Sequence, residues 1–444
     1  MNLLPHQLES VAKMRSLSGF FDMSDPGTGK TRVELADFWA RRQYGGGRAL
    51  VVAPKSILQP AWGDEIDKAA PGMTYSIAWA TNREKAFRES TDVVITNHDA
   101  AKWISERTDL LRGFDTLIVD ESTAFKNPIG IQRTKAMMKL SERFEWVRCL
   151  TGTPNPNTIL DVWAQAYLLD NGERLGKSYY AFRNVSCTPV QVGPGAAHLE
   201  WRDKPGIADA VFALLSDISI RHPFVSRGNA VSRFEFELSP KAREVYDDME
   251  RHAIALVGDT TITALHASAV MTKLMQIASG AVYNGDDYTL IDTTRYELIM
   301  DLIEERRHCL VAFEWRHQCE ELMKAAKKRG FSCAFMHGDT PRDERTAIVR
   351  RFQAGELRVL FAHPRTAGHG LTLTKGTTTI WSSPTFSSEL FKQFNARIDR
   401  TGQTEQVETI MVSAKRTVDN RAYAALGTKL SAMDLLLSLM EGAR

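Results

Sequence analysis

The chain of 444 residues is long enough to form two or three domains, each with its own core. With 43% hydrophobic and 25% charged residues, its composition is that of a globular protein and excludes a disordered or membrane-embedded class. The 56 basic and 54 acidic side chains give a formal net charge of +2, which neither requires nor excludes a nucleic-acid-binding cleft.

The N-terminus and the apolar runs of the chain carry no targeting or membrane signal. Residues 1–7 lack the basic-then-apolar pattern of a signal peptide, and no apolar run approaches the ~18 residues that a membrane span needs. The cysteines are scattered and form neither a C-x-x-C pair nor a metal-ligand spacing, which is typical of reduced thiols. We therefore expect a soluble, cytoplasmic protein that does not associate with membranes.

Residues 1–156 alternate helical stretches with short apolar strands, which is the pattern of a parallel sheet covered by helices on both faces. Each predicted strand runs into polar, Gly or Pro residues at its carboxyl end, where open α/β sheets bind their ligands. The predicted strands are residues 49–53, 92–96, 116–120 and 147–151. The fold class predicted for this region is therefore α/β.

The alternation stops between residues 157 and 235. Helical residues 160–169 are followed by a Gly/Pro-rich stretch, residues 188–195, that predicts a loop or hairpin inserted among helices. Residues 226–240 are expected to be a connector, and helices are predicted over residues 240–257 and 262–279. The prediction is a helical insertion and connector over residues 157–235 that belongs to the first lobe, followed by a helical insertion of the second lobe over residues 236–294.

A second α/β alternation is predicted over residues 295–444. Its strands are residues 309–313, 333–336, 358–362, 378–381 and 409–412. In residues 431–440, apolar side chains at helical spacing predict a C-terminal helix that packs on this region rather than on a partner. Because the sequence shows no internal repeat and no low-complexity tract, the expected architecture is two α/β lobes joined by helical segments.

A Gly-x-Gly-Lys-Thr run predicts a phosphate-binding loop over Asp25–Thr31. Its glycines let backbone amides face a phosphate, Lys30 supplies a point charge for the β and γ phosphates, and Thr31 offers a hydroxyl to magnesium. At the first position of the full motif, where a glycine is usual, this chain has Ser24. The alternative for this motif taken alone is an ordinary glycine turn that caps a helix.

Two acidic residues, Asp120 and Glu121, follow the predicted strand 116–120 and are expected at the same sheet edge as Lys30. There, one carboxylate can hold magnesium and its neighbour can polarise an attacking water. The alternative for an isolated pair is two solvated acids in a loop. The segment Leu150–Pro154 ends the last strand of this region, and its small hydroxyl residues either respond to the γ-phosphate or simply form a turn.

In the second α/β region, Gln393, Arg397 and Arg400 are predicted to lie on a helix that ends at Thr401 and Gly402. A spacing of three residues places both guanidinium groups on one helix face. An arginine supplied in trans to a triphosphate stabilises the transferring phosphoryl group, typically by about 10³–10⁵ in rate. The alternative is a solvated helix face.

Taken in order, these motifs resemble the Swi/Snf-like branch of superfamily two helicases and DNA translocases over nearly the whole chain. In the first lobe the matching segments are Leu4–Gln7 (the adenine-reading Gln motif), Asp25–Thr31 (motif I), Ala53–Ser56 with Trp62 (motif Ia), Thr96–His98 (motif Ib), Asp120–Thr123 followed by Lys126 and Asn127 (motif II) and Leu150–Pro154 (motif III). In the second lobe they are Val311–Phe313 (motif IV), Thr366–Leu373 (motif V) and Gln393–Gln403 (motif VI). Three departures, Ser24, the Ser-Thr ending of motif II and His369, remove no group with a direct charge role.

The resemblance implies an α/β fold of two tandem RecA-like lobes, residues 1–156 and 295–444, with helical insertions between them. It also implies ATP and magnesium as cofactors. The implied catalytic residues are Glu121, Asp120, Lys30, Arg397 and Arg400. The implied nucleotide contacts are Gln7, Pro26, Gly27, Thr28, Gly29, Lys30, Thr31 and Gly370, with magnesium at Thr31 and Asp120. The implied DNA-binding or coupling residues are Lys55, Thr96, Asn97, Thr151, Thr366 and Gln393.

The function that the resemblance implies is an ATP-dependent, DNA-stimulated motor that translocates on or remodels duplex or branched DNA. Phosphate contacts carry no sequence information, so we expect sequence-independent binding by a monomer. The compact size is typical of phage and bacterial members, which would place a phage-encoded protein in the host cytoplasm. Two alternatives stay open: a strand-separating or branch-migration helicase, and a nucleotide-switched DNA- or protein-binding module without productive turnover.

Overall fold

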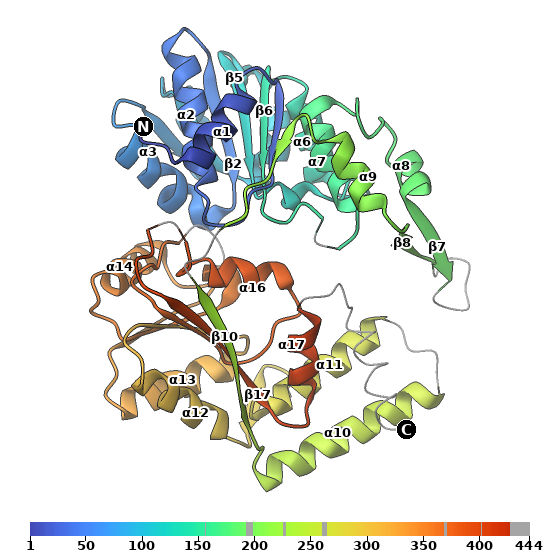
Figure 1. Cartoon of the computed structure of the whole chain (residues 1–444), viewed down its shortest axis with the longest axis vertical. Coiled ribbons are helices and arrows are strands. Elements are labelled where there is room, and N and C mark those ends of the chain that lie inside the picture. Colours follow the sequence, from blue (N-terminus) through green and yellow to red (C-terminus); the bar gives the residue numbers. More distant parts are fainter. Residues whose placement is uncertain are drawn as a thin grey trace. The chain divides into compact units, whose positions relative to one another are not determined.

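The computed structural model describes residues 1–155, 157–191, 199–224, 228–259, 264–367, 371–400 and 402–426. The chain divides into two compact units, unit 1 (Met1–Val225) and unit 2 (Ser226–Arg444). In Figure 1 the ribbon of unit 1 runs from blue to green and that of unit 2 from green to red. The helix predicted over residues 431–440 lies outside the described residues.

Unit 1 is built on a seven-stranded sheet. Its strands are β1 (Gly19–Asp22), β2 (Arg48–Ala53), β3 (Tyr75–Ala78), β4 (Val93–Asn97), β5 (Phe114–Asp120), β6 (Trp146–Leu150) and β9 (Ser219–Ile220). The strand order is β3-β4-β2-β5-β6-β1-β9, and every neighbouring pair is parallel. Strands β2, β4, β5 and β6 confirm the four strands predicted from the sequence, whereas β1, β3 and β9 are additional.

Helices cover both faces of the unit 1 sheet. They are α1 (Pro5–Met14), α2 (Lys30–Gln43), α3 (Asp64–Ala69), α4 (Arg83–Arg88), α5 (Ala101–Ser105), α6 (Gln132–Ser141), α7 (Leu160–Asp170), α8 (Tyr179–Ser186) and α9 (Ile207–Leu214). In β2, Leu50 and Val52 belong to the apolar cluster that includes residues of α6 and α7, and Val51 belongs to the cluster that includes residues of α2. Because both faces are buried, the strands read as continuous apolar runs. Across the described ranges, no helix combines the length and apolarity needed to cross a bilayer.

A buried charge cluster ties α1 and α2 to the sheet. Arg148 of β6 is fully buried, and its guanidinium lies 3.5 Å from Asp37 and 3.9 Å from Glu34, both on α2. The same guanidinium donates hydrogen bonds to the carbonyl oxygens of Leu17 and Ser18, just after α1. Burial raises the pKa of Glu34 well above its ordinary value, although Arg148 opposes that shift. The cluster therefore holds both α2 and the end of α1 against β6.

An antiparallel hairpin, β7 (Cys187–Gln191) and β8 (Leu199–Asp203), lies between α8 and α9. Asp203 anchors its base, since both carboxylate oxygens accept the backbone amide of Ile159 at 3.0 Å. The guanidinium of Arg183 lies over the ring of Trp201 at 3.9 Å. The predicted loop or hairpin is confirmed as a hairpin for residues 188–191, which belong to β7, whereas residues 192–195 lie outside the described residues.

Unit 2 is built on a six-stranded parallel sheet. Its strands are β10 (Asn229–Phe236), β13 (Cys309–Ala312), β14 (Cys333–Met336), β15 (Val359–Ala362), β16 (Thr378–Trp381) and β17 (Val407–Ala414), in the order β10-β17-β16-β13-β15-β14. The five predicted strands are confirmed as β13–β17. The connector predicted over residues 226–240 is wrong for residues 229–236, which form β10. This strand lies at the sheet edge and is largely exposed, so it lacks the apolar run on which the prediction relied.

The helices of unit 2 surround this sheet and a short hairpin, β11 (Ala281–Asn284) and β12 (Asp287–Leu290). They are α10 (Pro240–Asp259), α11 (Ala264–Ala278), α12 (Thr294–Glu304), α13 (Arg316–Lys328), α14 (Arg342–Gln353), α15 (Pro364–Ala367), α16 (Ser388–Asn395) and α17 (Val418–Ala425). Arg295 is fully buried among them, pairs with Asp419 at 2.5 Å and donates to the carbonyl oxygens of Ala278 and Ser382. It thereby joins α11, α12, α17 and the sheet.

The cysteines are all free, and three of them are buried. Burial raises the pKa of Cys309 to about 12, so its thiol stays protonated at neutral pH. The prediction of unpaired thiols is confirmed.

His317 of α13 gives unit 2 a specific dependence on pH. Its ring nitrogens lie 3.0 Å from Ser279 Oγ and 2.9 Å from the hydroxyl of Tyr283, and burial lowers the pKa of His317 from 6.5 to about 4. Because the unfolded chain takes up this proton near pH 6.5 and the folded chain does so only near pH 4, stability is lost as the pH falls between these values.

From about pH 7.5 to about pH 5, the histidine should lower the free energy of unfolding by about 2 kcal/mol. Urea unfolding of the wild type and of His317→Gln at these two pH values measures the effect. The variant should lose about 2 kcal/mol less than the wild type, whereas equal losses would contradict the linkage.

Candidate functional site

The loop between β1 and α2 has the geometry of an anion cradle. Gly27 and Gly29 have φ angles of 90° and 84°, in the left-handed region that favours glycine. The loop leads directly into α2, a 14-residue helix that begins at Lys30, so the N-terminal end of this helix faces the loop. Lys30 Nζ donates to the carbonyl oxygens of Ser24 (2.6 Å) and Asp25 (3.2 Å). An ammonium group and a helix N-terminus therefore lie together over this loop.

Helix α1 closes one side of the loop. Gln7 is buried, its Nε2 donates to the carbonyl oxygen of Thr28 at 2.9 Å, and its Oε1 accepts the amide of Leu4 at 2.9 Å. His6 Nε2 donates to the same Thr28 oxygen at 2.9 Å. A Cβ atom at Gly29 would lie only 2.3 Å from Gln7 Nε2, so a larger residue there would displace the Gln7 amide, and the φ angle of 84° independently favours glycine. The sequence prediction that Gln7 belongs to this site agrees with its position against the loop.

The acidic pair lies at the end of β5. Asp120 Oδ2 accepts the indole N–H of Trp62 at 2.9 Å, and its Oδ1 accepts the amide of Glu121 at 2.9 Å. His98 Nε2 donates to the carbonyl oxygen of Asp120 at 2.8 Å. Glu121 adopts φ 49° and ψ 55°, a left-handed conformation that costs a non-glycine residue on the order of 1–3 kcal/mol and is found mostly at functional sites. The surrounding contacts hold Asp120 firmly and set Glu121 in a strained position.

A third segment, Thr151–Pro154, lies directly against the phosphate loop. Thr151 donates its amide to the carbonyl oxygen of Asp22 at 3.0 Å, and its Oγ1 accepts the amide of Thr153 at 3.1 Å. A Cβ atom at Gly152 would lie 2.8 Å from Pro26 Cδ, so this glycine permits close contact between the two loops.

Sheet register brings these segments together. Leu150 of β6 is in register with Asp22 of β1 on one side and with Asp120 of β5 on the other. The three strands therefore end at the same level, and the phosphate loop, the Thr151 segment and the acidic pair leave the sheet side by side. We call this edge, with Gln7 of α1, the unit 1 site.

The two predicted arginines of unit 2 lie after α16 and not on it. The predicted helix through Arg400 is wrong, because α16 ends at Asn395. The backbone amide of Arg397 donates to the carbonyl oxygen of Phe394, three residues earlier. The carbonyl oxygen of Gln393, four residues earlier, instead accepts a hydrogen bond from Arg397 Nε at 2.7 Å. The four-residue bonding of the helix is therefore lost at this point.

The guanidinium groups nevertheless converge. Nη1 of Arg397 and Nη1 of Arg400 both donate to the carbonyl oxygen of Leu371, at 3.3 and 3.0 Å. Leu371 belongs to the predicted motif V, so the structure joins the segments named motifs V and VI. Gln403 completes this group, since its Nε2 donates to the carbonyl oxygens of Thr374, Gly376 and Ile398.

Two protein-family models match the chain, one in each unit. Residues 9–221 match the model described as "SNF2-related domain", and residues 294–404 match the "Helicase conserved C-terminal domain". The chain belongs to the SNF2-related helicase family. The resemblance and the two-lobed α/β fold predicted from the sequence are thereby confirmed.

Three relatives and one solved structure illustrate the likeness. "Putative protein p41" of Acyrthosiphon pisum secondary endosymbiont phage 1 is 32% identical over 425 residues, 88% of each chain. "Putative ATP-dependent helicase/translocase YwqA" of Bacillus subtilis is 23% identical and "Uncharacterized ATP-dependent helicase MG018" of Mycoplasma genitalium 22% identical, over 93% and 95% of this chain. This chain spans 46% and 41% of those two proteins, less than half of each. "Sulfolobus solfataricus SWI2/SNF2 ATPase core in complex with dsDNA" is 21% identical, covering 96% of this chain and 91% of that chain, with a TM-score of 0.46.

The residues predicted to contact DNA or to couple the lobes of this SNF2-related protein fall into two groups. Lys55 is exposed and Asn97 is half-buried, so both reach the surface. Thr96 is fully buried and its hydroxyl donates to the carbonyl oxygen of Ala78 at 2.9 Å, so a direct DNA contact by its side chain is not supported. The buried residues Thr151, Thr366 and Gln393 are suited to coupling rather than to surface contact. Gly370 lies outside the described residues.

Sequence reasoning missed Gln165 of α7. It is fully buried, its Oε1 accepts the hydroxyl of Ser122 at 2.7 Å, and its Nε2 donates to the carbonyl oxygens of Pro154 and Asp161, both at 2.7 Å. One amide thereby links the segment after the acidic pair to the Thr151–Pro154 segment. The available signal was a single amide in the largely apolar middle of α7, residues 162–169.

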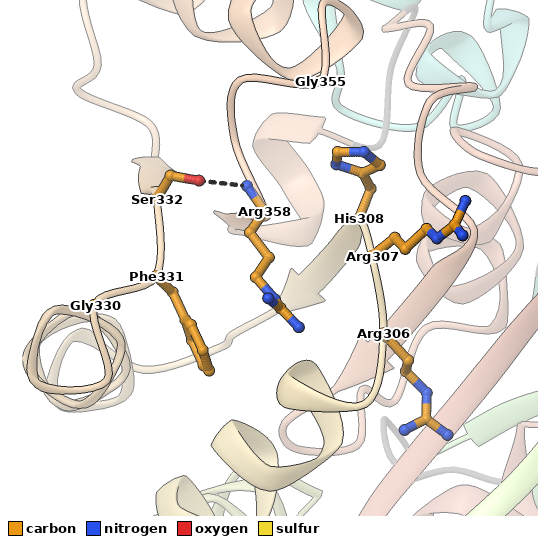
Figure 2. Close-up of a pocket in the computed structure, with 8 residues that line it drawn as sticks. All are labelled: Arg306, Arg307, His308, Gly330, Phe331, Ser332, Gly355 and Arg358. Atoms are coloured by element: carbon orange, nitrogen blue, oxygen red, sulfur yellow. Dashed lines mark hydrogen bonds between the residues drawn. The ribbon is translucent and has the colours of Figure 1, made fainter.

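A pocket of about 430 Å³ in unit 2 lies apart from these motifs. It is lined by Arg306, Arg307, His308, Gly330, Phe331, Ser332, Gly355 and Arg358 (Figure 2). These residues flank the amino ends of β13, β14 and β15, whereas motifs IV and V lie at the carboxyl ends of the strands. Arg306 pairs with Glu408 at 2.5 Å and Arg358 donates to the carbonyl oxygen of Glu304 at 2.6 Å. These two guanidinium groups stabilise the fold. Because the pocket lies at the opposite ends of the strands from the motifs, it is not part of the candidate site.

Proposed function

We propose that this chain is an ATPase motor that hydrolyses ATP at the unit 1 site and uses the energy to translocate on or remodel DNA. The observation that supports this most strongly is that Asp22, Leu150 and Asp120 are in register at the carboxyl ends of three neighbouring strands. The phosphate loop, the Thr151–Pro154 segment and the acidic pair therefore leave the sheet next to one another. Family membership and the relatives named ATP-dependent helicases support the same function.

In this proposal Lys30 and the amides of the loop bind the β and γ phosphates, and Gln7 reads the adenine. Magnesium fits the available donors, because Thr31 and Asp120 offer a hydroxyl and a carboxylate, the oxygen ligands that this ion prefers beside phosphates. Throughout the described ranges, no group of three or more His, Cys, Asp or Glu residues forms a protein-only metal cage. Bound magnesium would neutralise charge on the phosphates.

Glu121, which has a strained left-handed backbone, is proposed to take a proton from the attacking water. Arg397 and Arg400 are proposed to stabilise the charge on the transferring γ-phosphoryl group. Their shared contact with Leu371 supports a joint action with the motif V segment.

The proposed polymer is DNA, duplex or branched, bound through its phosphates without sequence preference. Family membership and the relative named a helicase/translocase support this choice. Exposed Lys55 and half-buried Asn97, at the carboxyl ends of β2 and β4, are the proposed contacts in unit 1. We further propose that the protein works as a monomer in the cytoplasm.

Adding DNA is expected to raise the rate of ATP hydrolysis at least about tenfold, the change that 1.4 kcal/mol of transition-state stabilisation brings. A panel of single-stranded, duplex and forked DNA of two unrelated sequences, titrated at several salt concentrations, measures the effect. Stimulation should be independent of sequence. The apparent binding constant for duplex DNA, taken from each titration, should fall steeply with salt, with a log–log slope of about −0.9 per phosphate contact.

The control for contaminating ATPases is Lys30→Ala, which should show no stimulation on any DNA. If no nucleic acid stimulates the wild type, the motor function is wrong. A strand-displacement assay on the same forks separates translocation on duplex DNA from strand separation.

A further inference from the structure

The last described segment of unit 1, Ser219–Phe224, is hydrogen-bonded along the phosphate loop. We call it the exit segment, because the chain passes from it into unit 2. After β9 it continues beside the residues that follow β1: Met23 donates its amide to Ile220 at 2.8 Å, and Asp25 donates its amide to His222 at 3.0 Å. The pairing of β1 and β9 therefore extends into the loop itself.

The backbone of His222 explains the serine at the first position of the phosphate-loop motif. Its amide donates to Ser24 Oγ at 3.0 Å, and Ser24 is buried. A glycine at this position would offer no side-chain acceptor. Asp25 adds two contacts, since its Oδ2 accepts the amide of Phe224 at 3.1 Å and its Oδ1 lies 3.6 Å from the guanidinium of Arg221.

The ring of His222 contacts α1, the helix that closes one side of the phosphate loop. Its Nε2 lies 3.0 Å from Ser10 Oγ on α1. Because that hydroxyl donates its own hydrogen to the carbonyl oxygen of His6 at 3.2 Å, it accepts the hydrogen bond from the His222 ring. The rings of His6 and His222 also meet edge to face, with centroids 5.4 Å apart.

We infer that His222 is a positioning residue for nucleotide binding, with its backbone fixing Ser24 and Asp25 and its ring fixing α1. Through α1 it also supports Gln7 and His6, the two side chains that bond to Thr28. A loop with two glycines in the left-handed region is intrinsically loose, so its phosphate-binding shape depends on neighbours that hold it. This inference rests on the proposed function, because it concerns the affinity of the same site for ATP.

The test is the equilibrium dissociation constant of a slowly hydrolysed ATP analogue, measured by calorimetry on the full-length chain. His222→Ala should bind about tenfold more weakly, the effect of losing one well-placed buried hydrogen bond. His222→Gln, whose amide can still donate to Ser10, should recover most of the affinity. In steady state with saturating DNA, His222→Ala should raise KM for ATP about tenfold and change kcat less than about twofold.

The matched control is His337→Ala, a partly exposed histidine of unit 2, which should leave the dissociation constant unchanged. If His222→Ala does not fold, Ser24→Ala removes the acceptor of the same clamp and should weaken binding to a similar degree. Wild-type affinity in both variants, or no recovery with His222→Gln, would overturn the positioning role. A wild-type protein that binds no nucleotide would instead contradict the proposed function.

Discussion

Replacing Glu121 with glutamine is expected to lower the rate of DNA-stimulated ATP hydrolysis by roughly 10²–10⁴-fold, the usual contribution of a positioned general base. Glutamine has nearly the same shape but cannot accept a proton from water at neutral pH. The loop, Lys30 and Asp120 are untouched, so affinity for ATP should stay within about threefold of the wild type. The structural reason to choose Glu121 is its left-handed backbone next to Asp120, whose own oxygens accept Trp62 and the Glu121 amide.

Single-turnover hydrolysis and analogue binding, measured on the same preparation, separate chemistry from affinity. Glu106→Gln, at an exposed position after α5, is the matched control and should behave as the wild type. Wild-type turnover in Glu121→Gln would remove Glu121 from its proposed role. A parallel loss of ATP binding would show that the residue supports the site rather than the water.

Replacing Arg400 with alanine is expected to reduce the maximal ATPase rate by about 10³-fold or more, the lower end of the effect of an arginine that stabilises the phosphoryl transition state. Arg397 is buried and bonds to the carbonyl oxygen of Gln393, so its removal would disturb the fold. We therefore choose Arg400 for the substitution. Since the phosphate loop lies in unit 1, analogue binding should change little. Arg400→Lys should recover only part of the rate, because an ammonium group lacks the planar fork of a guanidinium.

The matched control is Arg351→Ala, which removes an exposed arginine of α14 that pairs with Glu356. It should leave both rate and affinity unchanged. Thermal unfolding of each variant checks that unit 2 is intact. An Arg400→Ala protein with more than about a tenth of the wild-type rate would place the transition-state arginine elsewhere.

The sequence predicted most of the strands because buried parallel strands read as apolar runs. Strand β2, with Leu50, Val51 and Val52 buried, is such a case. Strand β1 has only two apolar residues, Phe20 and Phe21, between Gly19 and Asp22, and β9 has two residues in all. The pairing of β1 with β6 and of β9 with β1 defines these strands, and that information is not local in the sequence.

Local pattern also limits the prediction of strand β10 and of the end of α16. Strand β10 exposes most of its residues at the sheet edge, and only its parallel pairing with β17 makes it a strand. The arginine spacing in motif VI suggested one continuous helix, yet Arg397 uses its side chain to take the carbonyl oxygen of Gln393. Competition between side-chain and backbone donors of this kind is invisible to periodicity.

The residues of the unit 1 site were predictable where a motif carries them. Gln7, Lys30, Asp120 and Glu121 were predicted, and the structure places them around one sheet edge. Gln165 and His222 were not predicted, since each acts by holding other segments and neither belongs to a recognisable spacing. His222 is separated from Ser24 by almost 200 residues, so only the folded chain shows that they bond.

The pairing of β1 with β9 has a consequence for how the protein is made. Ser219 and Ile220 lie in register with Phe21 and Asp22, so β1 cannot complete its pairing until the edge strand β9, from the far end of unit 1, has been synthesised. At about 5–20 residues per second, a translating ribosome needs roughly 10–40 s to supply it after β1 has been synthesised. During that interval the nascent chain should have no anchored loop with which to capture ATP. Nucleotide binding would then begin only after unit 1 has left the ribosome whole.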